Sequence, residues 1–389
     1  MTATETFDNL DGKTLDGILA TSLELLEDNS FPSVRKWREG GGKVIGHFQV
    51  YFPEEIAHAA GTLPFKVRGA PIDAMQAESR FGSYLCSILK TSLELALSDN
   101  VELDMFVTHP ICDAARNLAG VWGRNFPYPC QILYLPQNAN SAYSAQYLRD
   151  EYDRIKADIE NITGTSVHED DLRNSIALFN VNRGLIRELY EIKRTQPWLL
   201  PIEEAYVLMA VGGIIPREQH NELLELALPQ IRARQTRQQD KIRVVFEGGF
   251  CEQPPLDFLR VISRSCFVVD DDLMIGLRWI TEDIPTEGDP LMNLAVAYLE
   301  SSTYSPVQHD LRKPKEKMLM ERIQAAGAEA AIVAAAKMCE PGLDEQVAYA
   351  KVLDESGVPY FLNEFEEKMT SFDQIQVQLE TFAENILFF

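Results

Sequence analysis

The stretch Met105-Phe106-Val107-Thr108-His109-Pro110-Ile111-Cys112-Asp113-Ala114-Ala115-Arg116 holds the structural unit that decides the fold. Its first four residues are apolar or β-branched and predict a short buried strand, which Pro110 ends. The residues from Asp113 onward favour a helix with an acidic residue in its first turn. The sequence therefore predicts a strand, a turn and a helix in succession, with Cys112 in the turn.

The same alternation extends to both sides of this unit. Each short β-prone run in the N-terminal part is followed by a helical pattern, which is the rhythm of βαβ units and of a parallel sheet. The runs are Val44 to Phe48, Phe65 to Val67, Met105 to Thr108 and Ile132 to Leu135. The helices begin near Pro53, Gly82 and Ala114.

Two regions of helical pattern flank this first group of strands. Residues 1–40 favour helix, because one face of the pattern collects residues at helical spacing, namely Leu15, Ile18, Leu19, Ser22 and Leu26. From about Ser144 to Gln239 the pattern is one of long helices with no convincing strand between them. These helices are expected at Gln146 to Ile162, Asp170 to Lys193 and Glu218 to Arg234.

The βα alternation returns after residue 240. Strands are expected at Ile242 to Phe246, Phe267 to Val269, Ala331 to Ala336 and Tyr360 to Asn363, and helices near Leu256, Pro290, Glu316 and Glu345 and from Phe372 to Leu387. We therefore predict an α/β protein with two parallel-sheet βα domains, an N-terminal helical segment and a central helical region. The expected parts are an N-terminal helical segment plus first α/β domain at 1–143, a helical linker or subdomain at 144–239, and a second α/β domain at 240–389.

Composition and charge exclude several classes of protein. The 389 residues, 46% of them apolar, exceed the usual span of one core, so two or three domains are expected. The formal net charge of -23 repels phosphate backbones, and we expect no nucleic-acid partner. The N-terminus is acidic where a secretory signal is basic, and no run approaches the roughly 20 apolar residues of a membrane span. We therefore expect a cytoplasmic protein without a membrane partner.

The one glycine-rich run does not match a phosphate-binding loop. In Gly40-Gly41-Gly42-Lys43, Trp37 stands at the position of the first glycine that such a loop requires, and Val44 stands at the position of its Ser or Thr. No G-x-G-x-x-G pattern follows a predicted strand either. We therefore expect that any ATP is hydrolysed by another polypeptide.

The six cysteines, at positions 86, 112, 130, 251, 266 and 339, are too scattered for a secreted disulfide framework. Cys112 and Cys339 each follow a predicted buried strand and precede a helix, so both fall in βα turns of parallel sheets. Ligands gather at the carboxyl ends of such strands, and a helix N-terminus favours a thiolate. Cys86 lies early in a helix expected from Tyr84 to Leu97 and could project into the same cleft.

The pattern of the cysteines leaves three interpretations open. Three thiolates in one cleft suit either an iron-sulfur cluster or a zinc ion. They could also be independent core thiols, because a buried free cysteine is usually a small apolar residue. Cys251 ends a strand and is a further candidate ligand or site-lining residue. Cys130 and Cys266 lie just before or at the starts of apolar strands and are expected to pack in the core.

Glu54 and Glu55 open a helix directly after the first predicted strand. A desolvated glutamate with a raised pKa is a common general acid, so these carboxylates are candidate proton donors. The alternative is that both merely complement the helix dipole. His47 and His109, each close to a strand end, are similarly ambiguous.

Several segments together resemble one family over nearly the whole chain, the 2-hydroxyacyl-CoA dehydratase and benzoyl-CoA reductase family. They are Tyr51-Phe52-Pro53-Glu54-Glu55-Ile56-Ala57-His58-Ala59-Ala60-Gly61, Tyr84-Leu85-Cys86-Ser87, Pro110-Ile111-Cys112-Asp113 and Met338-Cys339-Glu340-Pro341. The segments at 247–255 and 276–280 are more similar to benzoyl-CoA reductase than to the dehydratases, and the length is closer to its C-type (gamma) subunit. Glu340 stands where many relatives have Asp after the cysteine.

The resemblance implies that Cys86, Cys112 and Cys339 bind a 4Fe-4S cluster, and it indicates Glu55 as a catalytic carboxylate. It also implies a catalytic oxidoreductase subunit of anaerobic aromatic degradation, which passes low-potential electrons to benzoyl-CoA to give a cyclic dienoyl-CoA. The implied partners are a homologous cluster-bearing subunit and an ATP-hydrolysing activator. The alternatives are a subunit of a 2-hydroxyacyl-CoA dehydratase and a non-catalytic electron-relay or scaffold subunit.

Overall fold

The computed structural model describes residues 13–48, 52–82, 84–98, 100–248, 254–273, 280, 282–302, 310–366 and 368–388. Within these residues the chain forms two four-stranded sheets whose paired strands are all parallel. The predicted α/β fold with two parallel sheets is therefore confirmed. Cys251, together with the rest of 249–253, and residues 274–279 lie outside the described residues.

The first sheet has the strand order β2-β1-β3-β4. Its strands are β1 (Val44–Phe48), β2 (Leu63–Val67), β3 (Met105–Thr108) and β4 (Cys130–Ile132). The connecting helices are α4 (Glu54–Ala59), α5 (Met75–Glu78), α6 (Ser87–Leu97) and α7 (Asp113–Asn125). The chain leaves β1 toward β2 and then returns to the other side of β1 as β3. The connections after β1 and β3 therefore run in opposite directions, which marks the place where open parallel sheets bind ligands.

The second sheet repeats this topology in the order β6-β5-β7-β8. Its strands are β5 (Ile242–Glu247), β6 (Cys266–Asp271), β7 (Ala330–Ala336) and β8 (Tyr360–Phe365). The helices of this part are α12 (Leu256–Ser265), α13 (Pro290–Ser301), α14 (Lys315–Ala326), α15 (Glu340–Ser356) and α16 (Asp373–Phe388). In both sheets the second strand lies on one side of the first strand, and the third and fourth strands follow on the other side of the first strand. β3 and β7 are therefore equivalent strands.

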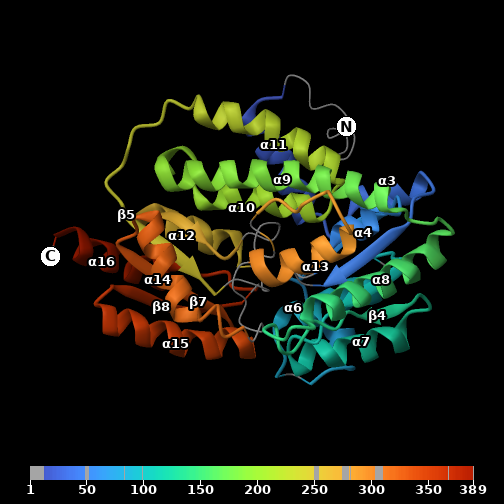
Figure 1. Ribbon diagram of the computed structural model, residues 1–389. Helices are drawn as coiled ribbons and strands as arrows, with labels where there is room; N and C mark the ends of the chain where they lie inside the picture. The colour runs from blue at the N-terminus through green and yellow to red at the C-terminus, as the bar shows by residue number, and fades with distance from the viewer. Residues whose placement is uncertain are drawn as a thin grey trace.

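A layer of helices joins the two sheets. α9 (Glu169–Thr195), α10 (Ile202–Ala210) and α11 (Arg217–Arg232) run side by side above both halves of the molecule in Figure 1. α9 contacts α4 in the first half and β6 in the second. The remaining helical segments are α2 (Leu15–Glu27), α3 (Pro32–Glu39), α8 (Ser144–Thr163), η1 (Pro197–Leu199) and η2 (Val211–Gly213). No strand lies between residues 144 and 239, all of which the structure describes, as predicted.

The hydrophobic core around the first sheet includes a helix from the C-terminal part of the chain. Leu291, Leu294 and Tyr298 of α13 belong to the same buried cluster as Ile45 of β1 and Val107 of β3. α13 also contacts α8. A helix of the C-terminal part therefore packs in the core of the first half, and the division of the chain at residues 143 and 239 stays a prediction.

Several predicted boundaries differ from the structure, and three of the differences have a clear local cause or change a site residue's position. The helix expected from Tyr84 begins at Ser87, because a ψ of 152° takes Cys86 out of the helical conformation and makes it the N-cap. The strand expected from Ile132 to Leu135 begins at Cys130 and ends at Ile132, in register with β3. The N-terminal helix is divided into α2 and α3, where Phe31 adopts a left-handed φ of 45° before Pro32.

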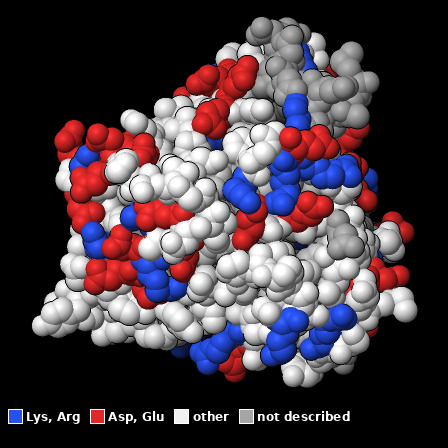
Figure 2. Space-filling view, turned by 90° about the vertical axis from the view of Figure 1, so that its right-hand side faces the viewer, with Lys and Arg blue, Asp and Glu red and all other residues white. Residues whose placement is uncertain are grey.

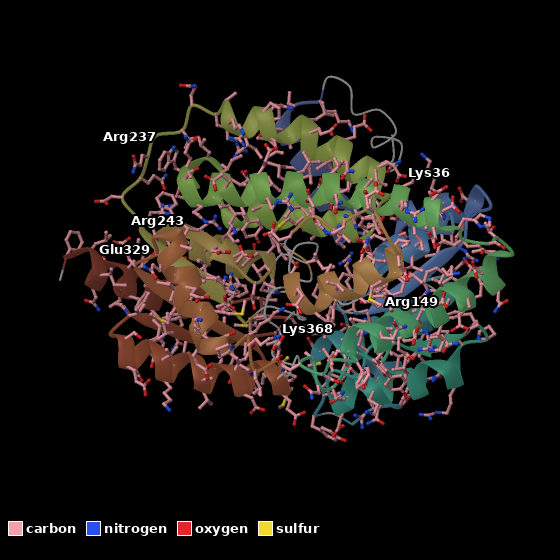
Figure 3. The ribbon with its side chains drawn as sticks, viewed as in Figure 1. Lys36, Arg149, Arg237, Arg243, Glu329 and Lys368 are labelled. Carbon is pink, nitrogen blue, oxygen red and sulfur yellow. The ribbon has the colours of Figure 1, made fainter. Side chains whose placement is uncertain are left out.

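The charge of the protein is unevenly distributed over its surface. Figure 2 shows patches of Lys and Arg between the acidic side chains of one face. Arg35 and Lys36 of α3 are exposed, and Lys36 lies at the outer edge of the first half in Figure 3. A net charge of -23 therefore leaves room for local attraction of anions. Among the described residues, no helix is long and apolar enough to cross a bilayer.

Candidate functional site

Cys112 and Cys339 occupy equivalent places in the two sheets. Cys112 follows β3, Cys339 follows β7, and each of these strands lies beside the first strand of its sheet. Each cysteine is the N-cap of the next helix, α7 or α15. The prediction that both lie in βα turns at the carboxyl ends of strands is confirmed.

The first turn of α7 surrounds the sulfur of Cys112. The Ala115 N–H donates to Cys112 Sγ at 3.4 Å. Burial raises the pKa of the Cys112 thiol above its ordinary value, and the negative charges of Glu340 and Asp113 raise this pKa further. The backbone N–H groups of Ala115 and Ala114 lower the pKa, but by less than burial raises it. A cation that displaces the thiol proton would therefore bind beside backbone dipoles that favour the thiolate.

The turns that contain Cys112 and Cys339 lie close to each other. Glu340, which directly follows Cys339, is near enough for its charge to act on the Cys112 thiol. Ile111 packs against the buried cluster that contains Cys339. The N-terminal ends of α7 and α15 therefore adjoin, although the two cysteines belong to different sheets.

The turn before α15, which contains Cys339, has a strained backbone at the preceding residue, Met338. Met338 has a left-handed φ of 63°, which an L-residue other than glycine adopts at a cost. The Lys337 N–H donates to the Phe365 carbonyl at 2.9 Å, and the Cys339 N–H donates to the Ala336 carbonyl at 3.0 Å. A Cβ atom at Gly342 would lie 3.4 Å from Cys339 Sγ, so the sulfur lies over the first turn of the helix. Residues in strained backbone conformations are found most often at functional sites.

Cys86 shares the local position of the other two candidates. It is the N-cap of α6, and it is half-buried against the core of the first sheet. Within the part of the chain that the structure describes, no three His, Cys, Asp or Glu side chains converge closely enough to hold a metal ion. The common site of Cys86, Cys112 and Cys339 therefore stays a prediction.

Cys130 and Cys266 lie at the opposite edges of the sheets. Each is the first residue of its strand, β4 or β6, whereas Cys112 and Cys339 follow strand ends. Both pack in hydrophobic clusters, as predicted. Burial raises the pKa of both thiols to about 12. Such thiols are unreactive, which is typical of packing residues.

Glu54, which is half-buried, and Glu55, which is buried, both form charged pairs with arginines of the helical layer. Glu55 is 1% exposed, and Arg183 of α9 donates to its Oε1. Arg217 of α11 donates to Glu54 Oε2, and His47 Nε2 lies 2.9 Å from Glu54 Oε1. Burial would raise the pKa of Glu54, but the charge of Arg217 and the bond to His47 outweigh it and lower the pKa to about 2. The two carboxylates therefore tie α4 to two other helices.

A buried histidine completes the network around Arg217. The Nε2 of His220 lies 2.9 Å from the Leu208 carbonyl, so it donates there, and its Nδ1 accepts from Asn182 at 2.9 Å and from Arg217 at 3.1 Å. Burial lowers the pKa of His220 to about 3, and the charge of Arg217 adds to this effect. Burial likewise lowers the pKa of His109 to about 3. Both rings are therefore neutral at physiological pH.

The carboxyl edge of the second sheet carries a similar cluster of charges. Lys193 of α9 donates to Asp271 Oδ2, and both side chains are 0% exposed. Tyr190 donates to the other Asp271 oxygen at 2.6 Å. Arg322 donates to Glu247 at the end of β5. Buried carboxylates thus lie at the strand ends of both sheets, and they are paired with Arg or Lys side chains of the helices.

The arginines and the lysine of these networks were not among the site residues predicted from the sequence. The signal was present in α9, where Arg183 and Lys193 fall on the buried helical stripe of Leu172, Ile176, Phe179, Ile186 and Tyr190. A basic residue on such a stripe requires a buried carboxylate partner. The identity of that partner was not visible, because Glu55 and Asp271 are far from α9 in the sequence.

Comparison with protein families identifies the class to which this fold and site belong. The model of the family described as "2-hydroxyglutaryl-CoA dehydratase, D-component" matches residues 49–386. The chain therefore belongs to this family, as its cysteine and Pro-Glu-Glu motifs predict.

Individual relatives match over nearly their whole length. The chain is 34% identical to the C-type subunit of the benzoyl-CoA reductase of Thauera aromatica, over 95% of this chain and 98% of the relative. It is 28% identical to the beta subunit of lactoyl-CoA dehydratase of Anaerotignum propionicum, over 89% and 92%. It is 25% identical to the beta subunit of (R)-2-hydroxyglutaryl-CoA dehydratase of Acidaminococcus fermentans, over 90% and 94%. All three names describe one subunit of a larger enzyme.

The neutral His220 makes stability depend on pH. Its folded pKa of about 3 lies below the ordinary value of 6.5, so the unfolded chain binds a proton that the folded chain does not. Unfolding free energy is therefore lost as pH falls from about 6.5 toward about 3, by about 1.4 kcal/mol per pH unit for this histidine. We expect His220→Gln to remove that part of the slope in urea unfolding between pH 7 and pH 5. The exposed His168→Gln should leave it unchanged, and an unaltered slope in His220→Gln would contradict the assignment.

Proposed function

We propose that this chain is the cluster-bearing catalytic subunit of an ATP-dependent aromatic acyl-CoA reductase, which reduces benzoyl-CoA to a cyclic dienoyl-CoA. The observation that carries the proposal is the 34% identity to a benzoyl-CoA reductase subunit over 95% of the chain. The placement of Cys112 and Cys339 at equivalent strand ends supports it, because a redox group held there lies between the two sheets.

The residues present suit a 4Fe-4S cluster. Cys86, Cys112 and Cys339 are each the N-cap of a helix, where backbone N–H groups favour thiolates. The three residues are the ones we propose to hold the cluster.

The cluster, when bound, supplies one-electron transfer at low potential. The chain's own residues set the conditions for that transfer. Backbone N–H groups directed at a sulfur, such as that of Ala115, tune the redox potential. The 8% exposed Cys339 keeps its part of the site away from water. Exclusion of water protects a strongly reducing centre from losing its electrons to solvent.

We further propose two protein partners and a cytoplasmic location. The relatives are named as subunits, which supports pairing with a homologous cluster-bearing subunit. The sequence contains no phosphate-binding loop of the usual pattern, so we assign ATP hydrolysis to a separate activator. The aromatic acyl-CoA would bind in the assembled complex.

The second candidate function is that of a 2-hydroxyacyl-CoA dehydratase subunit. It is favoured by the description of the matching family and by the two dehydratase beta subunits among the relatives. The same cluster ligands would serve that reaction. Substrate choice alone therefore separates the two candidates.

An activity assay tests the proposed function. The complex of this chain with its partner subunit and activator is purified without oxygen and supplied with ATP and a strong reductant. We expect consumption of benzoyl-CoA with formation of a cyclic dienoyl-CoA, and no dehydration of lactoyl-CoA or 2-hydroxyglutaryl-CoA. Dehydration of either hydroxyacyl thioester without reduction of benzoyl-CoA would show that the second candidate is correct.

Replacement of the cysteines tests the cofactor. We expect Cys86→Ala, Cys112→Ala and Cys339→Ala each to lose the visible absorbance and the reduced-state paramagnetic signal of the cluster, because each leaves only two thiolates. Cys130→Ala and Cys266→Ala are matched controls at the opposite sheet edges, and they should cost only packing, about 1 kcal/mol each. Full iron and sulfide content in any of the first three variants, or loss of the cluster in a control, would refute the ligand set.

A catalytic role for Glu55 remains a proposal with its own test. If Glu55 transfers protons, Glu55→Gln lowers turnover per bound iron by about 100-fold or more. The buried pair with Arg183 supports a structural role instead, in which loss of either partner lowers the unfolding free energy by about 3–5 kcal/mol. Arg183→Gln is the matched control, because it breaks the same pair and keeps the carboxylate. Equal losses of stability and iron in both variants, with normal turnover per iron, would exclude proton transfer by Glu55.

A further inference from the structure

A cavity of about 660 Å³ lies between the two halves of the protein. Its walls come from α2, from the loop after β2, from α10, from the start of α12 and from the segment after β8. Cavities of a few hundred to a thousand Å³ at such boundaries are the usual sites of small-molecule ligands. This cavity is separate from the buried charge networks described above.

Most of the cavity wall is apolar. The side chains of Leu23 and Leu26 line it from α2, those of Tyr206 and Val207 from α10, and Met369 lies on the far side. Two prolines, Pro254 and Pro255, add rigid surface at the start of α12. A ligand that fills this space is therefore largely apolar along its length.

Among the described residues, three basic and three acidic side chains line the cavity, namely Arg68, Arg260 and Lys368 and Glu27, Asp73 and Asp257. Arg260 donates to Asp257 at 2.8 Å, and Lys368 donates to Asp73 at 2.6 Å. Arg260 and Lys368 are 46% and 43% exposed, and their partners Asp257 and Asp73 are 67% and 87% exposed. Figure 3 shows Lys368 near the junction of the two halves. Exposed ion pairs contribute at most about 1 kcal/mol, so a phosphate can replace Asp73 or Asp257 as the partner at little cost.

The cavity wall is connected to the turns of the candidate cluster cysteines. The Ala70 N–H, in the loop after β2, donates to Thr91 Oγ1 of α6 at 3.2 Å, and Cys86 caps that helix. Met369 packs against the buried cluster that contains Cys339. The elements that line the cavity therefore contact helix α6, which Cys86 caps, and the buried cluster that contains Cys339.

This combination fits one part of an acyl-CoA better than the others. The nucleotide carries several phosphate charges, whereas the described part of the wall offers one buried cation, Arg68, whose guanidinium already lies 5.0 Å from the centroid of the Phe31 ring. The acyl-pantetheine arm is long, neutral and mostly apolar, and its amides need few partners. The exposed Lys368 and Arg260 suit phosphate groups that remain at the mouth.

We propose that the cavity holds the acyl-pantetheine arm of the CoA thioester, with the phosphates of the nucleotide bound outside by Lys368 and Arg260. This inference rests on the proposed function, because it takes the acyl-CoA as the ligand. It assigns substrate binding to this chain rather than to its homologous partner.

Calorimetric titration of the assembled complex, without reductant or ATP, tests the proposal with benzoyl-CoA as the probe. Leu23→Trp adds bulk to the cavity and should weaken binding about tenfold or more. Glu24→Trp places the same side chain on the exposed face of α2 outside the cavity, and it should bind as the unaltered complex does. Iron content is measured in both variants, so that loss of the cluster is not mistaken for loss of the cavity.

A second variant tests the mouth independently of the cavity. Lys368→Gln should weaken benzoyl-CoA binding about fivefold and reduce its salt dependence, but it should leave the binding of S-benzoylpantetheine, which lacks the nucleotide, unaffected. Lys351→Gln, on the exposed face of α15, is the matched control. This variant alters one exposed side chain and keeps the proposal testable if Leu23→Trp fails to assemble.

The outcomes separate the proposal from the function on which it rests. If the unaltered complex binds no benzoyl-CoA, the proposed function fails and the proposal fails with it. If the complex binds benzoyl-CoA and an assembled Leu23→Trp binds it equally well, the substrate lies elsewhere and only the proposal is overturned. Equal weakening of benzoyl-CoA and S-benzoylpantetheine by Lys368→Gln would overturn the phosphate contact.

Discussion

Two buried ion pairs on one helix hold the two sheets in a fixed relation. α9 is roughly 40 Å long at 1.5 Å per residue. Its Arg183 pairs with Glu55 after β1, and its Lys193 pairs with Asp271 at the end of β6. A charge buried without its partner is strongly destabilising, so neither sheet can move along α9 without breaking a pair. The position of every turn at the two carboxyl edges depends on this constraint.

The repeated topology then decides which turns meet. In each sheet the third strand lies beside the first, and the turn after it carries a cysteine at a helix N-cap. Because α9 fixes the sheets, the ends of β3 and β7 adjoin, and the charge of Glu340 reaches Cys112. A redox group bound there would be shared by both halves, so its integrity would depend on their packing.

Charged and apolar side chains occupy different places at the boundary between the two halves of the protein. The buried acids Glu55 and Asp271 and the half-buried Glu54 are all paired with basic side chains of the helical layer, and these pairs hold the helices and sheets together. The cavity, at another place between the two halves, is mostly apolar, and its exposed cations Arg260 and Lys368 are paired with acids. The paired charges of the interior fix the packing of the helices on the sheets. A neutral part of a ligand can bind in the apolar cavity without breaking these pairs.

The sequence by itself determined the elements and the local position of the cysteines. Apolar runs such as Ala331 to Ala336 and the turn residues after them define strands and helices through local patterns, and the cysteine motifs identify the family. Only the tertiary structure decided the strand order, the packing of α13 on the first half and the partners of Arg183 and Lys193. The physical reason is that buried pairs and packed helices join residues far apart in the chain, and no local pattern specifies which distant carboxylate a buried base will meet.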